Sequence, residues 1–130
     1  ESLGISLNNF VILDGSGLSD KDRLTPNQII AVLKDAFRNL SMYPEFIASL
    51  AVMSVDGSAE DRLVNIPEAS RARVKTGTLD GVSALSGYFQ SKQGERFAFS
   101  MLMNDLRCHA NNALKIQDKI ITEGLNFERK

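Results

Sequence analysis

The stretch Arg73-Val74-Lys75-Thr76-Gly77-Thr78 opens the part of the sequence that decides the fold. It is short and rich in β-branched residues, which predicts a strand. Leu79-Asp80-Gly81 follows as a turn, and residues 82–90 and 96–103 are predicted as two further strands joined by a hairpin loop at 91–95. Alternation along the last strand puts four large apolar side chains on one face, Phe97, Phe99, Met101 and Met103. The sequence therefore predicts three consecutive antiparallel strands.

Helices are predicted upstream of these strands. Thr25-Pro26-Asn27-Gln28 has the form of a capping box with proline at the first helical position. Apolar residues then recur at three- and four-residue spacing to about Leu40, as in an amphipathic helix. A second, shorter helix is expected from Pro44 through Leu50. Residues 53–71 are expected to be mostly loop with one helical turn.

The two ends of the chain complete the pattern. Residues 10–13 are an apolar run before the turn cluster Asp14-Gly15-Ser16-Gly17, which predicts a short buried strand running into a tight loop. A C-terminal helix beginning near Ala110 has Gly124 as its expected C-cap. The order is strand, helices, three strands, helix. This order predicts an α+β fold in which helices flank an antiparallel sheet.

The composition is that of one folded domain of 130 residues, with 43% hydrophobic and 24% charged residues. A formal net charge of -1 gives no indication of a nucleic-acid partner. Cys108 is the only cysteine, so an intrachain disulfide and a cysteine-based zinc cluster are both excluded. No apolar run is long enough for a membrane span, and the N-terminus of the chain lacks the basic region followed by an apolar one that is typical of a signal peptide. Because the chain opens at Glu1 without a methionine, a processed or truncated product is expected.

The triplet Lys75-Thr76-Gly77 is the sharpest chemical motif. K-T-G is the third element of the serine penicillin-recognising enzymes, beside S-x-x-K and S-D-N. On its own the triplet is weak, because a solvated lysine at a strand end followed by a glycine bulge explains it equally well. A Cys–His pair at Cys108 and His109 is disfavoured, because adjacent side chains point in different directions. The methionines of the last strand are expected in the core, and neither a metal nor another cofactor is predicted.

Several further motifs occur in a fixed order along the chain, and together they are more specific than the K-T-G triplet alone. Asp14-Gly15-Ser16-Gly17-Leu18-Ser19 lies upstream, Asp56-Gly57-Ser58 comes before K-T-G, and Leu79-Asp80-Gly81-Val82, Leu85-Ser86-Gly87-Tyr88 and Gly94-Glu95-Arg96-Phe97 follow it. In this arrangement the chain closely resembles the class C low-molecular-mass penicillin-binding proteins. These are D-alanyl-D-alanine carboxypeptidases and endopeptidases of the DacB type. One departure is Asp20, where the family commonly has arginine.

The resemblance implies acyl transfer through a serine ester on peptidoglycan stem peptides that end in D-Ala-D-Ala, with β-lactam antibiotics as further ligands. Lys75, Thr76, Gly77 and Thr78 would bind substrate, and Lys75 and Thr78 would be catalytic. Lys75 would supply positive charge for the terminal carboxylate, and the Thr76 and Thr78 hydroxyls would face that carboxylate. The Thr78 N–H would be an oxyanion-hole donor. Asp14, Ser16 and Asp56 are secondary candidates that either contact substrate or only shape turns near the cleft.

The nucleophile that this chemistry needs is missing, because no serine has a lysine three residues later. Ser70-Arg71-Ala72-Arg73 comes nearest, but arginine cannot act as the base. We therefore expect the C-terminal part of a transpeptidase-like domain, with the missing N-terminal part as a partner and apolar faces left exposed. A periplasmic or envelope location follows from the resemblance. The alternative is a non-catalytic module that binds peptidoglycan or a protein partner.

Overall fold

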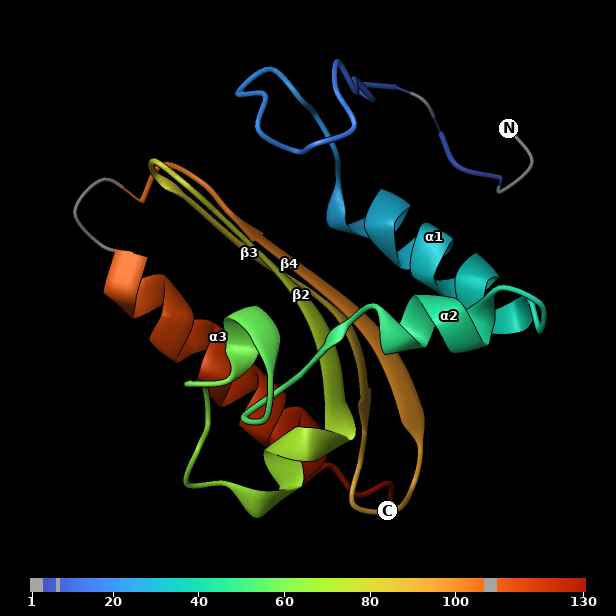
Figure 1. Cartoon of the computed structure of the whole chain (residues 1–130), viewed down its shortest axis with the longest axis vertical. Helices are drawn as coiled ribbons and strands as arrows, with labels where there is room; N and C mark the ends of the chain where they lie inside the picture. Colours follow the sequence, from blue (N-terminus) through green and yellow to red (C-terminus); the bar gives the residue numbers. More distant parts are fainter. Residues whose placement is uncertain (1–3, 7, 107–109) are drawn as a thin grey trace.

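The computed structural model describes residues 4–6, 8–106 and 110–130. Within them a four-stranded antiparallel sheet has the order β1-β2-β3-β4, formed by Ala51–Val52, Ala72–Leu79, Val82–Gln90 and Arg96–Met103. Helix α3 (Ala110–Leu125) lies on one face of this sheet, and α1 (Pro26–Arg38) and α2 (Tyr43–Ala48) lie on the other (Figure 1). The predicted α+β architecture is confirmed.

The three long strands also confirm the sequence prediction. β3 and β4 have the predicted bounds, and β2 is one residue longer at each end. The turn between β2 and β3 is reduced to Asp80-Gly81, with Gly81 at φ +69°. Positive φ is what a two-residue hairpin turn requires, and glycine adopts it without a steric cost.

The face beneath α3 holds the larger core. Ala72, Val74, Leu85, Ile121 and Leu125 are fully buried there, together with Met53, Ala59 and Ala69 from the connection between α2 and β2. In the strand register Leu85 stands between Thr76 and Met101, so alternate residues of the strands share this face. Phe97, Phe99, Met101 and Met103 lie on the same face, as predicted.

The opposite face holds a smaller, aromatic core. It buries Leu33 of α1, Tyr88 of β3, and Leu50 from the connection between α2 and β1. Tyr43 and Phe46 of α2 pack against these three side chains. The Tyr88 hydroxyl donates a hydrogen bond to the Leu33 carbonyl across this layer. The capping box at the start of α1 is present as predicted, with the Thr25 and Gln28 side chains bonded reciprocally to each other's backbone N–H.

Two glycines allow close approaches that no other residue would permit. A Cβ on Gly87 of β3 would stand 2.0 Å from the Arg73 carbonyl oxygen, and Gly87 has φ +152°. A Cβ on Gly124 of α3 would lie 2.5 Å from the Phe89 ring. Gly124 was predicted as a C-cap, and this prediction is wrong because the helix continues to Leu125. Its role is to let α3 approach the sheet.

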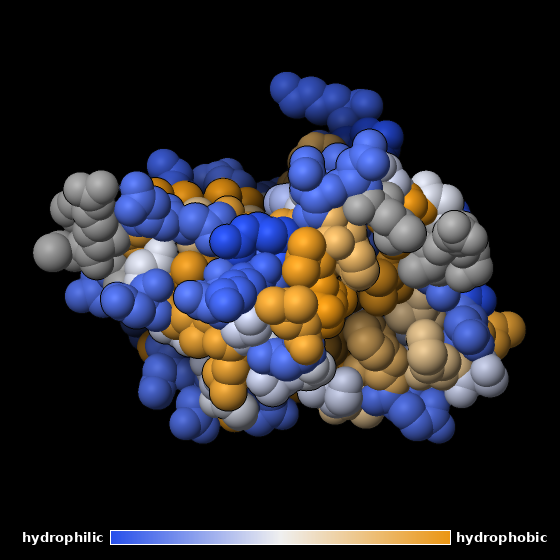
Figure 2. All heavy atoms as spheres, turned by 90° about the horizontal axis from the view of Figure 1, so that it is seen from above, coloured by the Kyte–Doolittle hydropathy of each residue, from blue (hydrophilic) through white to orange (hydrophobic). Residues whose placement is uncertain are grey.

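The buried strand predicted at 10–13 is also wrong. Only Val11 forms an isolated bridge, to Arg23, and the apolar side chains of 10–13 are 37% to 61% exposed. These side chains are thus only partly covered, and Figure 2 shows that hydrophobic atoms lie open to solvent in the middle of the face seen from above. The expected helix through Leu50 instead ends at Ala48, because Ala51 and Val52 pair with β2 as the short strand β1. The loop at 53–71 contains two 3₁₀ turns, Gly57–Ala59 (η1) and Pro67–Arg71 (η2).

Candidate active site

The outer edge of β2 carries the K-T-G motif. β1 pairs only with Arg73 and Val74, so in the described chain no strand lies beside the rest of β2 on this side. The Met53 N–H donates to the Ala72 carbonyl, which shows that Ala72 directs its backbone groups toward β1. Because backbone groups of alternate residues point to the same side of a strand, those of Thr76 and Thr78 face the uncovered edge. This edge can accept an extended ligand by backbone hydrogen bonds.

The side chains of the motif divide between the two faces of the sheet. Thr76 and Thr78 lie on the α3 face with Val74, and Lys75 and Gly77 lie on the other face. The Lys75 Nζ donates to the Thr76 carbonyl oxygen at 2.6 Å, so its charge lies beside the uncovered edge. A Cβ on Gly77 would lie 3.3 Å from that of Ala84, a tight contact. The two threonines therefore present their hydroxyls on one side of the edge, and the lysine approaches from the other.

Ser58 brings a second motif to this site. Its hydroxyl oxygen lies 2.6 Å from that of Thr76, within hydrogen-bond distance, and η1 carries it there. Sequence reasoning noted Asp56-Gly57-Ser58 as a matching motif but did not single out Ser58 as a site residue. The signal was present in the order of the motifs, but spacing alone does not show that side chains 18 residues apart meet.

Asp56 holds the turn that presents Ser58. Its Oδ1 accepts the Val52 N–H at 2.6 Å, and its own N–H donates to the Val52 carbonyl. These contacts fix the path of the chain from β1 into η1. They match the turn-shaping alternative for Asp56, and direct contact with substrate stays a prediction.

Asp14 and Ser16 form a self-contained loop. The Asp14 Oδ1 accepts hydrogen bonds from the Gly17 N–H at 2.9 Å and from the Ser16 N–H and hydroxyl. The Gly17 N–H, followed by the Ser16 hydrogen bonds, holds the pKa of Asp14 below its ordinary value. The recorded hydrogen bonds of both residues stay within residues 14–18 and do not reach the K-T-G edge.

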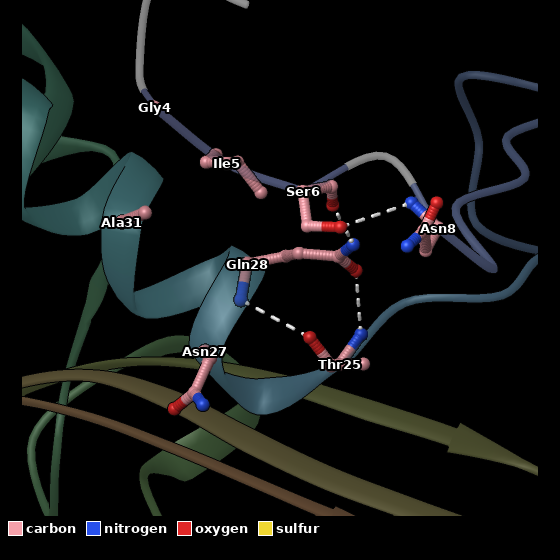
Figure 3. A pocket seen from close by; sticks show the side chains of 8 residues that line it. All are labelled: Gly4, Ile5, Ser6, Asn8, Thr25, Asn27, Gln28 and Ala31. Carbon is pink, nitrogen blue, oxygen red and sulfur yellow. Dashed lines mark hydrogen bonds between the residues drawn. The ribbon is translucent and has the colours of Figure 1, made fainter.

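A cavity of about 340 Å³ lies elsewhere, between residues 4–6 with Asn8 and the start of α1 (Figure 3). The Gln28 side chain donates to the Ser6 carbonyl at 2.8 Å and accepts the Thr25 N–H at 2.8 Å. The Gln28 side chain thus holds the N-terminal segment on α1. No K-T-G residue lines this cavity.

Across 4–6, 8–106 and 110–130 no three His, Cys, Asp or Glu side chains gather in a way that suits a metal ion. No helix in those ranges has the length and apolar character of a membrane span. Cys108 and His109 lie outside the described residues.

Comparison with known proteins gives one consistent family. The profile of the D-Ala-D-Ala carboxypeptidase 3 (S13) family matches residues 1–123. The D-alanyl-D-alanine carboxypeptidase DacB of Haemophilus influenzae is 31% identical over 103 residues, which cover 78% of this chain and 21% of that protein. A D-alanyl-D-alanine carboxypeptidase of Actinomadura sp. is 35% identical over 124 residues, covering 91% of this chain and 22% of that protein.

The solved structures agree with the sequence relatives. Penicillin-binding protein 4 of Haemophilus influenzae superposes with a TM-score of 0.85 and 25% identity, covering 97% of this chain and 30% of that one. The chain thus spans between a fifth and a third of the length of these relatives. With motifs, fold and profile in agreement over most of its length, the chain belongs to the D-Ala-D-Ala carboxypeptidase 3 (S13) family.

Proposed function

We propose that this chain supplies the K-T-G strand to the active site of a serine D-alanyl-D-alanine carboxypeptidase or endopeptidase that acts on peptidoglycan stem peptides. The uncovered edge of β2 at Thr76 and Thr78, with the Lys75 charge beside it, is the observation that carries this proposal. Both relatives quoted above that are called D-alanyl-D-alanine carboxypeptidases support the reaction. Such substrates place the protein in the periplasm or cell envelope.

The backbone edge would hold the substrate. A peptide ending in two D-alanines can lie antiparallel to β2 and pair with the Thr76 and Thr78 backbone groups. Lys75 provides a positive charge beside this edge for the terminal carboxylate. The Thr76 and Thr78 hydroxyls, on the other side of the edge, complete the polar contacts to that carboxylate.

The covalent steps need a serine from outside this chain. Its hydroxyl oxygen attacks the carbonyl carbon between the two D-alanines, its proton passes to a base, and an oxyanion forms. Because the Thr78 N–H points to the uncovered edge, it can donate to this oxyanion. Collapse breaks the C–N bond while the protonated base gives its proton to the leaving nitrogen, so D-alanine leaves as the amine and an ester remains. Water then hydrolyses the ester and regenerates the serine. A β-lactam enters the same path by ring opening. In support, the penicillin-sensitive carboxypeptidase A of Dictyostelium discoideum is 28% identical to this chain over 127 residues, which cover 93% of this chain and 24% of that protein.

Labelling with a fluorescent penicillin tests this function. The complete protein that carries this chain is expected to be labelled covalently, whereas this chain alone should stay unlabelled. Lys75→Met should slow labelling by about a hundredfold, the scale of losing one charge-stabilising group in an active site. Lys115→Met is the matched control, since Lys115 is exposed on α3. Labelling of this chain alone, or unchanged labelling of Lys75→Met, would contradict the proposal.

A further inference from the structure

A groove lined by cationic and aromatic side chains lies at the end of the sheet away from the K-T-G residues. One cavity of about 270 Å³ is lined by Lys34, Phe37 and Arg38 of α1 with Tyr88, Arg96, Phe97 and Ala98 of the sheet. A neighbouring cavity of about 180 Å³ shares Phe37, Tyr88 and Arg96 with it, and adds Tyr43, Ile47, Arg71 and Arg73 among its lining residues. We call the two together the basic groove.

Five cations surround the basic groove, and no carboxylate lines it. They are Lys34, Arg38, Arg71, Arg73 and Arg96. None of the ion pairs between described side chains includes any of the five. Like charges around one groove repel each other, and a bound anion relieves that repulsion. This local excess stands in a chain whose formal net charge is -1.

The wall of the basic groove is aromatic. The ring centroid of Phe37 lies 5.0 Å from that of Tyr43 and 6.3 Å from that of Tyr88. The Arg96 guanidinium lies 5.8 Å from the centroid of the Phe37 ring, so its charge is held at the wall. Arg71 is anchored by a hydrogen bond to the Ser91 carbonyl at 3.2 Å. These contacts restrain two of the cations before a ligand arrives, which lowers the entropy cost of binding.

From these contacts we propose that the basic groove binds an acidic peptide segment, one that carries two or more carboxylates with an apolar side chain between them. Arginine pairs with carboxylates through two parallel hydrogen bonds, and the aromatic wall covers an apolar side chain. A simple phosphate chain would satisfy the cations but leave the exposed part of Phe37, which is 37% accessible, in contact with water.

The basic groove is separate from the K-T-G edge. Arg73, the groove residue nearest to the motif along β2, precedes Lys75 by two residues and Thr78 by five, roughly 7 and 16 Å along an extended strand. The other cations of the groove lie on the far side of Arg73 from the motif, and no K-T-G residue lines either cavity. Because of this separation, peptide binding in the groove and penicillin labelling can be measured independently, and failure of one proposal leaves the other standing.

Calorimetric titration of the complete protein tests the groove. The probe is a capped peptide with the sequence Glu-Phe-Glu-Phe-Glu, beside the same peptide with lysine for glutamate and beside inorganic tripolyphosphate. Only the acidic peptide is expected to bind well, and more weakly as salt is raised. The double variant Arg73→Gln/Arg96→Gln should bind it about tenfold more weakly or worse, and penicillin labelling should stay unchanged.

Matched variants separate this role from general charge and from folding. Lys115→Gln/Lys119→Gln removes the same charge from exposed positions on α3 and should change affinity less than twofold. Phe37→Leu should weaken the peptide several-fold and leave tripolyphosphate unchanged. The proposal is overturned if the acidic peptide does not bind, if the α3 control loses as much affinity, or if tripolyphosphate binds more tightly than the peptide.

Discussion

The hydroxyl oxygens of Ser58 and Thr76 lie 2.6 Å apart, and this contact joins the 3₁₀ turn η1 to the K-T-G strand. Ser58→Ala removes the partner that orients the Thr76 hydroxyl. Since the pair is exposed, we expect unfolding free energy to fall by less than about 1 kcal/mol. Penicillin acylation of the complete protein should slow several-fold. Ser70→Ala is the control, because the Ser70 hydroxyl bonds only within η2. Equal acylation by both variants would remove Ser58 from the site.

The Thr78 backbone can be tested separately from its side chain. Thr78→Pro removes the N–H that faces the uncovered edge, and proline is tolerated there because the β2–β3 hydrogen bonds lie on the other side. Thr78→Val keeps the N–H and removes the hydroxyl. The proline variant should lose about a hundredfold in acylation rate and the valine variant much less, with both folded by circular dichroism. A larger loss in the valine variant would favour the hydroxyl over the N–H.

Gly124→Ala should destabilise the protein, even though alanine is more favourable than glycine in a helix by about 1 kcal/mol. The added Cβ would lie 2.5 Å from the Phe89 ring, and overpacking of this kind costs about 1–3 kcal/mol. Urea denaturation measures the net loss. Adding Phe89→Leu to Gly124→Ala should recover part of it, and a more stable single variant would contradict the packing role.

Arg62 links the loop before β2 to α3. Its guanidinium donates to the Asp118 carboxylate at 2.6 Å and to the Gln117 side chain, and Gln117 in turn donates to the Ser83 hydroxyl. Arg62 is only 11% exposed. A double-mutant cycle with Arg62→Met and Asp118→Leu should give a coupling energy of about 1–3 kcal/mol by denaturation. The exposed pair Lys92–Glu128 is the control and should give less than about 1 kcal/mol.

The pKa of Tyr88 determines how the free energy of unfolding should change at alkaline pH. Burial, with Tyr43 nearby, raises the pKa of Tyr88 to about 12 from 10.0. The neutral form is therefore favoured in the folded state, so this stabilisation is complete below pH 10 and is lost as pH rises toward 12. Tyr88→Phe should be less stable at neutral pH, because the bond to the Leu33 carbonyl is lost, but should lose less with rising pH. Denaturation at several pH values measures both slopes, and parallel slopes would contradict the prediction.

The sequence predicted the sheet well because alternation and turn chemistry are local. The bounds of β3 and β4, the Thr25 capping box and the Asp80-Gly81 turn all depend on neighbouring residues. The errors lie where distant contacts decide. Gly124 has the local features of a C-cap, but its contact with Phe89 is tertiary. The 10–13 run has the composition of a core strand, yet each of its four side chains is more than a third exposed.

The same limit applies to the site. Lys75, Thr76, Gly77 and Thr78 were found as a motif, and their catalytic roles stay predictions. The meeting of Ser58 with Thr76, and the gathering of five cations around Phe37 and Tyr88, could not be predicted, because each depends on how separate elements pack.

The two-residue length of β1 has a consequence for how this edge can change. β1 begins only where Ala51 pairs with Val74, so Thr76 and Thr78 keep their outward N–H and C=O groups uncovered. Extending β1 by four pairs from this end would close that edge as far as Thr78 and protect it from pairing with another chain, which is the usual hazard of an exposed strand. The same extension would abolish ligand pairing without altering Lys75, Thr76, Gly77 or Thr78. Insertions near residues 48–51 are therefore expected to inactivate the site as completely as replacing the motif.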